Sequence, residues 1–437
     1  MTLDRTIAPI LHWGKKITLP TCINKQEGGI AFTLFLDPNT SVLGFRFVFP
    51  RIDTVGNNPL LGHAAMEMLL RGTATKNTEQ LFQALETLGA RIRTSAARDY
   101  NEVTLRTSLR NLEPSLALLH EVLFIPRMAQ EDFEQWLEES KAEFIVNLED
   151  PAYLAGRALR STLYGTEHFY GELLQTEHYE TLTLDDVKQY WQQNIVSNCP
   201  SVIVAGGLKK EITTDPIATI AAWEFAKPTT SLRYGILRPT ASAIVHTPVP
   251  SGTQVPMYMG CLLPRHPFSG EYDLRIAVAL FGGVFSSRLM QNLREDKGYT
   301  YGIRAGISFY YDTGVLSIRT NVGNEYAKNA IEEIRNEFDR MQTVPATERE
   351  LEILRGQLLG DSMQALDGAW DAAANMFIYG FPVEEWYQNT RKKIEAISRV
   401  GVDEIVSIAS EWLRPDRFVL SVAGKEEVLH SLDWPLL

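Results

Sequence analysis

Three side chains in the segment Leu61–Thr73 have part of what a hydrolytic metal site requires. The segment predicts a helix, and His63, Met66 and Glu67 share one of its faces because residues three and four apart lie about one turn apart. An imidazole and a carboxylate are ordinary ligands of a divalent metal ion. The thioether of Met66 cannot accept a proton from a metal-bound water. The helix therefore retains one ligand histidine and lacks a general base.

The inverted zinc motif H-x-x-E-H shows what is missing. In that motif the two histidines bind zinc, and the intervening glutamate takes a proton from the metal-bound water. His63 stands in the place of the first histidine, Met66 in that of the glutamate and Glu67 in that of the second histidine. Loss of the base alone removes a factor of about 10²–10⁴ from a proton-transfer step. We therefore expect no protease activity from this chain alone.

The chain resembles the pitrilysin, insulysin and mitochondrial processing peptidase family of metallopeptidases, the inverzincins. The resemblance rests on the helix just described and on Leu69–Thr73, and it continues from Leu88–Ala90 through Arg98–Tyr100. It then runs along nearly the whole chain. It implies a family fold in which two similar halves face each other across a cavity.

The resemblance also implies a third ligand for the degenerate zinc site. The family takes this ligand from a glutamate shortly before an Asp-Pro pair, and Glu143, before Asp150-Pro151, fits that place. His63, Glu67 and Glu143 would make a harder and weaker zinc site than two imidazoles and one carboxylate. We expect no metal or other cofactor bound by this chain. Two alternatives remain open: these are ordinary polar residues of a helix pair, or they hold a residual metal ion.

A second cluster lies in the stretch Gly282–Tyr301, which matches the pattern that the family carries in its C-terminal half. Locally, Ser286 or Ser287 is placed to cap a predicted helix, and Lys297 and Gly298 suit its C-terminal end. The stretch therefore predicts a helix that ends near residue 294, followed by a strand that begins near residue 301.

Arg294 and Tyr301 are the candidate catalytic residues of this cluster. The resemblance implies that they reach a zinc centre, hold the substrate carbonyl and stabilise the oxyanion. A guanidinium is always protonated and a phenol is a neutral donor at pH 7. One oxyanion donor is typically worth about 10²–10³ in rate. From spacing alone, Arg294 could instead pair with Glu295 or Asp296, and Tyr299 is a second candidate tyrosine because strand alternation puts it on the same face.

Composition excludes several classes of protein. The 437 residues are 45% hydrophobic and 22% charged, as in soluble globular proteins, and the net charge of −12 argues against a nucleic-acid surface. The charge favours cationic or neutral partners and, given the basic peptide substrates of the resembled family, an acidic wall around the cavity. Three widely spaced cysteines, Cys22, Cys199 and Cys261, fit no disulfide framework.

The sequence predicts no membrane span. No stretch approaches the roughly 18 apolar residues of a membrane helix, and Met1–Pro9 shows no signal-peptide pattern. We expect a soluble protein that is cytoplasmic as the chain stands, or periplasmic if an export signal was trimmed.

The chain repeats itself. Val204–Gly206 recurs 218 positions later as Val422–Gly424, and Leu184–Val187 corresponds to Val402–Ile405 at the same shift. Each copy reads as strands, a helix, strands, then helices and a closing strand. This order predicts an α+β fold of two homologous domains, each with helices packed on a mostly antiparallel sheet.

The domain boundary is expected at the Pro-containing polar segment Lys227–Ser231. Residues 1–226 then form an N-terminal peptidase-like domain with the degenerate zinc motif. Residues 227–437 form a C-terminal peptidase-like domain that carries Arg294 and Tyr301.

Other motifs receive structural interpretations. Gly282-Gly283 lacks the Lys-Ser/Thr ending of a phosphate loop and indicates close packing. His168 and Tyr170 predict loop packing near the cavity, and Phe309–Tyr311 predicts strand and hairpin packing.

The leading hypothesis is a catalytically silent subunit of a heteromeric zinc metalloendopeptidase. A separate chain with an intact H-x-x-E-H helix would bring the zinc, while Arg294 and Tyr301 stabilise charge at the scissile bond of a peptide or unfolded polypeptide. One alternative is a structural or peptide-binding relative, like the core subunits of respiratory complexes. Another is a lone enzyme that uses His63, Glu67 and Glu143 with another metal.

Overall fold

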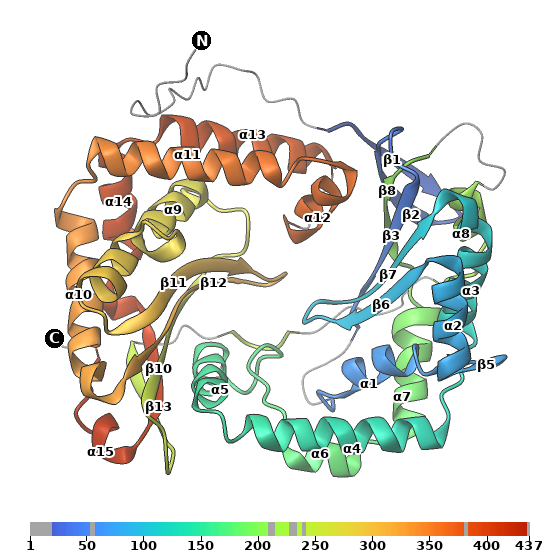
Figure 1. The fold of residues 1–437 in the computed structure, drawn as a ribbon, viewed down its shortest axis with the longest axis horizontal. Coiled ribbons are helices and arrows are strands. Elements are labelled where there is room, and N and C mark those ends of the chain that lie inside the picture. Colours follow the sequence, from blue (N-terminus) through green and yellow to red (C-terminus); the bar gives the residue numbers. More distant parts are fainter. Residues whose placement is uncertain are drawn as a thin grey trace.

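Two open sheets, each backed by helices, build the protein (Figure 1). The computed structural model describes residues 20–52, 57–208, 215–226, 234–237, 242–379 and 383–434. The predicted α+β fold with two similar layers is confirmed. The boundary expected at Lys227–Ser231 and the segment Met1–Pro9 fall outside the described residues.

The first sheet has, among the described residues, the strand order β1-β2-β8-β3-β7-β6, in which only the β2–β8 pair is parallel. Because side chains alternate along a strand, Phe45, Phe47 and Phe49 of β3 lie on the same face, where all three are fully buried. The strands are β1 (Cys22–Glu27), β2 (Ile30–Leu36), β3 (Val42–Pro50), β6 (Arg91–Ala96), β7 (Tyr100–Ser108) and β8 (Ser201–Gly206).

The outer face of this sheet is covered by helices of the same half (Figure 1). Local signals define several of them; for example, Asn77 and Gln80 form a capping box at the start of α2, and Gly89 ends it in a left-handed conformation. The helices and short elements are α1 (Leu61–Met68), β4 (Gly72–Thr73), β5 (Lys76–Asn77), α2 (Thr78–Leu88), η1 (Leu109–Asn111), α3 (Leu112–Phe124), α4 (Gln130–Asn147), α6 (Thr176–Thr181), α7 (Leu184–Trp191), η2 (Gln192–Val196) and α8 (Pro216–Ala221).

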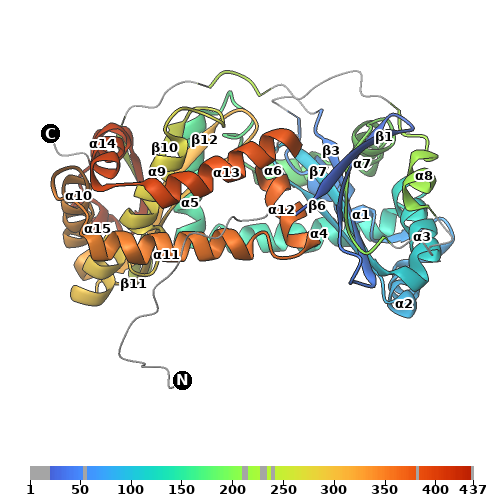
Figure 2. The same ribbon diagram turned by 90° about the horizontal axis from the view of Figure 1, so that it is seen from above.

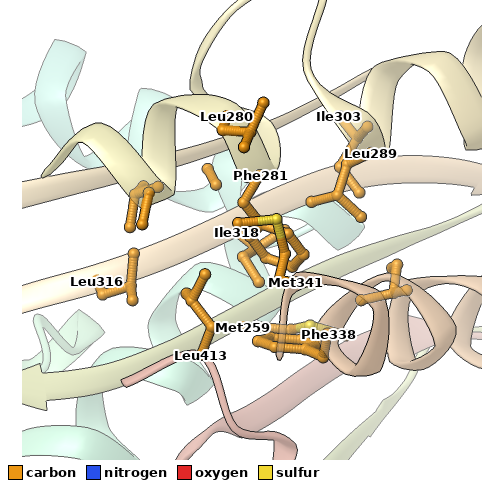
Figure 3. Packing of buried hydrophobic residues seen from close by; sticks show 14 of the residues in the cluster. Met259, Leu280, Phe281, Leu289, Ile303, Leu316, Ile318, Phe338, Met341 and Leu413 are labelled. Carbon is orange, nitrogen blue, oxygen red and sulfur yellow. The ribbon is translucent and has the colours of Figure 1, made fainter. Parts of the chain in front are cut away.

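The second sheet has the described order β11-β12-β10-β13-β9, with only β13 and β9 parallel. Its core includes Phe281 and Phe338, whose ring centroids lie 4.8 Å apart (Figure 3). Its elements are β9 (Ala243–Pro248), β10 (Gln254–Leu263), α9 (Glu271–Val278), η3 (Ala279–Gly283), η4 (Met290–Asp296), β11 (Thr300–Phe309), β12 (Gly314–Gly323), η5 (Asn324–Tyr326), α10 (Ala327–Thr343), α11 (Glu348–Gln364), α13 (Val383–Arg399), α14 (Val402–Trp412), η6 (Pro415–Arg417), β13 (Val419–Gly424) and α15 (Glu426–Leu429).

The sequence repeat corresponds to equivalent elements. Val204–Gly206 lies in β8 and Val422–Gly424 in β13, and each of these strands is antiparallel to one neighbour and parallel to the other. Leu184–Val187 opens α7, and Val402–Ile405 opens α14.

Each half also sends one helix to the inner face of the other half's sheet. Helix α5 (Pro151–Tyr164) packs on β10, β13 and β9, whereas α12 (Ala369–Tyr379) packs on β8 and β2. Figures 1 and 2 show α11 and α13 reaching across from the second half, with α12 at the far end. Each half therefore has a large core of its own residues, and two smaller clusters, where an exchanged helix meets the opposite sheet, combine residues of both halves.

Two glycines permit this exchange. A Cβ atom at Gly44 of β3 would lie 2.1 Å from the ring of Trp370 in α12. In β10, a Cβ atom at Gly260 would lie 2.7 Å from a methyl group of Leu163 in α5. Both contacts are far inside van der Waals distance, and at Gly44 the neighbour is a rigid ring, so glycine there lets α12 approach the sheet this closely.

The two halves also meet at the carboxylate of Asp99, in the β6–β7 turn. One oxygen accepts hydrogen bonds from the hydroxyls of Tyr170, at 2.5 Å, and Tyr234, at 3.1 Å. The other oxygen accepts the backbone N–H of Tyr311, in the β11–β12 hairpin, at 3.0 Å. Burial and the nearby Asp99 carboxylate raise the pKa of both phenols, which therefore stay protonated as donors.

A buried histidine strengthens this junction. Nδ1 of the fully buried His168 accepts the backbone N–H of Tyr170, so the proton lies on Nε2, which donates to Asp312 at 3.2 Å. His168 and Tyr170 therefore do more than the loop packing that the sequence suggested, since they connect α5 to the hairpin of the second half.

Within the described part of the chain, none of the helices combines the length and apolarity needed to cross a bilayer.

A Gly44→Ala substitution tests the packing of α12 on the first sheet. The added methyl group should force Trp370 off the sheet and lower the free energy of unfolding by about 1–3 kcal/mol, the usual cost of overpacking. Gly360→Ala is the matched control, because a Cβ there meets no heavy atom within 4 Å. Urea denaturation of both variants measures the effect, and an undiminished stability of Gly44→Ala would contradict the contact.

Candidate functional site

The helix that carries the degenerate motif begins where the sequence predicted but ends earlier, because Gly72–Thr73, expected within it, form strand β4. Helix α1 covers Leu61–Met68 and packs against α7, α4 and β6. Met66, which stands where the base belongs, is 2% exposed and lies in the core of the first half. A buried thioether cannot activate water, so the motif has no proton acceptor at this position.

His63 faces solvent on this helix, yet its imidazole is poorly hydrated. Desolvation by the surrounding protein, followed by repulsion from the Arg51 guanidinium, lowers the pKa of His63 below its usual value. Arg51 lies over the rings of Phe169 and Tyr190, at 5.0 and 5.9 Å from their centroids. Arg51 could not be predicted from the sequence, because it follows β3 and meets α1 only in the fold.

The two remaining candidate ligands, Glu67 and Glu143, differ in their contacts. Glu67 pairs with Arg71 at 3.3 Å, and Arg71 also contacts Glu139 of α4 at 3.4 Å. Glu143 is an exposed residue on α4. In the described ranges, no group of three or more histidine, cysteine, aspartate or glutamate side chains could hold a metal ion. His63, Glu67 and Glu143 therefore do not fit a zinc ion in this structure.

The second cluster lies on a wide turn. The helix predicted here is present, but η4 is a π-helix, with Lys297 N–H donating to the carbonyl of Asn292 at 3.0 Å. Gly298 ends it with a φ of +66°, as predicted. The predicted serine cap is absent: the buried hydroxyl of Ser287 has no hydrogen-bond partner within the described residues. Short π-helical turns often occur at functional sites.

Arg294 and Tyr301, the two candidate catalytic residues, lie together. The Cζ atom of Arg294 is 5.2 Å from the ring centroid of Tyr301 and 4.8 Å from that of Phe285. Tyr301 is 90% exposed, and Phe285 is 60% exposed. The guanidinium therefore lies against two exposed rings at the surface of the second half. Sequence reasoning missed Phe285, although it belongs to the same matched stretch.

The alternative partner of Arg294 contributes little. Nε of Arg294 lies 3.4 Å from Glu295, whose side chain is 45% exposed. An exposed ion pair of this kind is worth about 0–1 kcal/mol. The hydroxyl of Tyr301 has no hydrogen-bond partner in the part of the chain that the structure describes. Both groups therefore keep donors that can turn toward a ligand.

Two buried anchors hold the turn against the helices behind it. Arg288 donates to Glu350 at 3.0 Å and to the carbonyls of Arg340, Val344 and Pro345. Asn292 donates to Glu333 at 2.9 Å and to the buried Glu337 at 2.7 Å. The backbone under Arg294 is therefore fixed, while the Arg294 side chain stays at the surface.

Tyr299 and Tyr301 are not equivalent, contrary to simple alternation. An irregularity in the pairing of β11 with β12 between Thr300 and Ile303 shifts the register. Tyr299 stacks on Tyr326 with ring centroids 4.9 Å apart. Tyr301 alone points its ring toward Arg294. Gly282 confirms the close-packing interpretation of its motif, since a Cβ there would lie 2.8 Å from Ala305.

The environment of His63 gives a pH prediction. An NMR titration of the imidazole should give a pKa below the usual value of about 6.5. Because the unfolded chain then takes up the proton first, the free energy of unfolding should fall as the pH drops below about 6.5. A His63→Gln variant should lack this part of the pH dependence. A pKa at or above 6.5, or a shift of the His63 signals with one equivalent of zinc, would contradict the assignment.

Comparison with known proteins agrees with this geometry. Residues 57–177 match the family model described as Insulinase (Peptidase family M16), and residues 181–358 match the model described as Peptidase M16 inactive domain. An uncharacterized zinc protease of Bacillus subtilis is 22% identical over 310 residues, which cover 70% of this chain and 74% of that protein. One from Mycobacterium leprae is 19% identical over 371 residues, which cover 83% and 82%.

Solved structures share the fold. The peptidase M16 inactive domain from Pseudomonas fluorescens aligns with a TM-score of 0.82 and 21% identity, covering 92% of this chain and 98% of that one. A protease from Helicobacter pylori aligns with a TM-score of 0.80 and 16% identity, covering 93% and 100%. The family resemblance inferred from the motifs is confirmed. With Met66 buried in place of the base, this chain belongs to peptidase family M16 as a member whose own zinc motif is inactive.

Proposed function

We propose that this chain is the non-catalytic subunit of a heteromeric zinc metalloendopeptidase, and that it binds peptide and stabilises the oxyanion. The observation that carries the proposal is an asymmetric loss. The first half has a buried thioether in place of the base, whereas the second half retains a half-buried arginine and an exposed tyrosine side by side. A partner chain with an intact H-x-x-E-H helix supplies the hydrolytic site.

The chemistry assigned to this chain is hydrogen-bond donation. The guanidinium of Arg294 and the hydroxyl of Tyr301 donate to the carbonyl oxygen of the scissile peptide as it gains negative charge. Neither group has to lose a proton at pH 7, so both stay donors throughout the step. The exposure of Tyr301 supports a role toward a second molecule, because no described element of its own chain covers it.

Phe285 is assigned as a positioning residue. A guanidinium over an aromatic face is attracted by the ring quadrupole, and Phe285 lies nearer to the Arg294 Cζ atom than Tyr301 does. The ring limits the rotamers of Arg294 without using any of its N–H donors. All five donors therefore remain available to a substrate carbonyl and to Glu295.

The rival functions have less support. A purely structural role gives no reason for an exposed Tyr301 hydroxyl without a partner beside a cation. A lone enzyme would need Glu67 as a ligand, but Arg71 pairs with that carboxylate. The relatives named above as zinc proteases favour a proteolytic assignment over a structural one.

Mixing the chain with an H-x-x-E-H relative, ideally one encoded beside it, tests the proposal directly. Cleavage of a quenched fluorescent peptide should appear only in the mixture. The double substitution Arg294→Ala with Tyr301→Phe should lower kcat by about 10²–10³ or more, because oxyanion donors are lost.

Arg304→Ala with Tyr299→Phe is the matched control, since it removes an exposed guanidinium and a phenol hydroxyl from the same segment without touching the pair. Equal activity of the test variant and the control would reject the assigned role. Cleavage by the isolated chain would revive the lone-enzyme alternative.

A second prediction concerns Phe285. Phe285→Leu should lower kcat by about 2–5-fold, as expected for loss of an exposed cation–π contact of about 0.5–1 kcal/mol. Phe285→Tyr keeps the ring and should keep the rate. Measuring kcat and KM separately in the reconstituted complex distinguishes an effect on the position of Arg294 from an effect on peptide binding. An unchanged kcat in Phe285→Leu would show that the ring does not position the guanidinium.

A further inference from the structure

The inner face of the first sheet carries a row of arginines. In β6, Ile92 enters the core, so Arg91 and Arg93 point to the opposite side, where both are exposed. In the same way, Leu105 of β7 is buried and Arg106 is exposed on the inner side. Arg46 of β3 shares that face, which is also the face that α12 contacts.

The strand register brings these charges close together. Arg91 stands directly opposite Arg106 across the β6–β7 pair. Arg93 stands opposite Thr104, which is itself opposite Arg46 in the β3–β7 pair. Like charges directly opposite each other on a sheet are destabilising. The face therefore carries an unfavourable charge arrangement that folding alone does not explain.

The neighbouring acidic groups do not neutralise the row. Arg46 pairs with Glu102 at 3.3 Å. Within the described residues, Arg91, Arg93 and Arg106 have no carboxylate oxygen within the 4.0 Å of an ion pair. Among these residues, the carboxylate whose negative charge acts on the Arg106 guanidinium is that of Asp371 in α12. Four cations thus face two carboxylates, on a chain whose net charge is −12.

The helix exchanged from the second half holds one edge of this row in place. The Cζ atom of Arg106 lies 4.0 Å from the ring centroid of Trp370, and that of Arg46 lies 4.4 Å from the ring of Phe377. Both aromatic residues belong to α12. The cation–π contacts fix Arg106 and Arg46 while leaving Arg91 and Arg93 exposed. The arginine face is therefore complete only when both halves are assembled.

We propose that the exposed part of this face, formed by Arg91 and Arg93 with Arg106 beside them, binds acidic segments of an extended peptide, while Arg46 stays paired with Glu102 beneath α12. Arg91 and Arg93 are two residues apart on one strand, or about 6.6 Å, which is also the spacing of alternate side chains in an extended peptide. A guanidinium and a carboxylate make short, charge-assisted hydrogen bonds. This assignment rests on the proposed peptidase-subunit function and names its preferred substrate class.

An acidic peptide fits better than a nucleic acid. A long polyanion would meet the negative charge of the rest of the chain, whereas a few glutamates reach only this face. The net charge had suggested an acidic wall and basic substrates. On this sheet face the local charge is reversed, and it predicts the opposite preference.

A binding experiment with the isolated full chain tests this inference without any partner. Two fluorescent peptides are compared by anisotropy, one with glutamate at alternate positions and one with glutamine in their place. The glutamate peptide should bind at least about tenfold more tightly, and the difference should shrink as salt is raised. Arg91→Gln with Arg93→Gln should abolish the preference, while Arg110→Gln, an exposed arginine outside the row, should keep it.

A charge-reversal variant gives a second test. The variant Arg91→Glu with Arg93→Glu should prefer a matched lysine peptide. Thermal unfolding of this variant should show no loss of stability, since both side chains are exposed and the repulsion from Arg106 is relieved. Equal binding of the glutamate and glutamine peptides, or competition by a single-stranded oligonucleotide at the same affinity, would overturn the inference. Failure here would leave the subunit role intact, because cleavage in the reconstituted complex is measured separately.

Discussion

The Asp99 carboxylate is the interaction on which the arrangement of the two halves depends most. It accepts hydrogen bonds from Tyr170, Tyr234 and the backbone of Tyr311, which lie in three separate segments. Buried phenols need a partner, and a single ionised carboxylate serves both. The exchange of α5 and α12 also holds the two halves together, because each sheet is covered by a helix from the other half. The two halves are therefore one structural unit, despite their separate sheets.

The first half is folded and well packed although its zinc motif has no general base. Met66 contributes to the core of the first half, and Glu67 has an ion pair with Arg71. The substituted motif residues therefore have structural contacts of their own. In the second half, buried bonds of Arg288 and Asn292 hold the turn, and the Arg294 and Tyr301 side chains remain at the surface. The residues that hold this turn and the two side chains assigned to the proposed function are thus separate sets.

Local patterns predicted the elements of the fold well. The α1 helix, the Gly298 stop and the repeated strand–helix units were visible because they depend on neighbours in sequence. The matched stretch pointed to Arg294 and Tyr301 as candidates, and their role stays a prediction. The π-turn at η4 and the register shift after Thr300 were not predicted, because helix type and strand register depend on hydrogen bonds that apolar alternation does not specify. Phe285 was missed for a related reason, because its contact with Arg294 depends on how that turn is wound.

The sequence alone determined which chemistry is absent, because the side-chain type at residue 66 decides whether a proton can be accepted. It also determined the repeat and the mostly antiparallel sheets, since these depend on the alternation of apolar residues. Only the tertiary structure decided which helix covers which sheet and where charge gathers. Net charge sums over the whole chain, whereas the arginine face forms because the register of β3, β7 and β6 brings four distant cations onto one side.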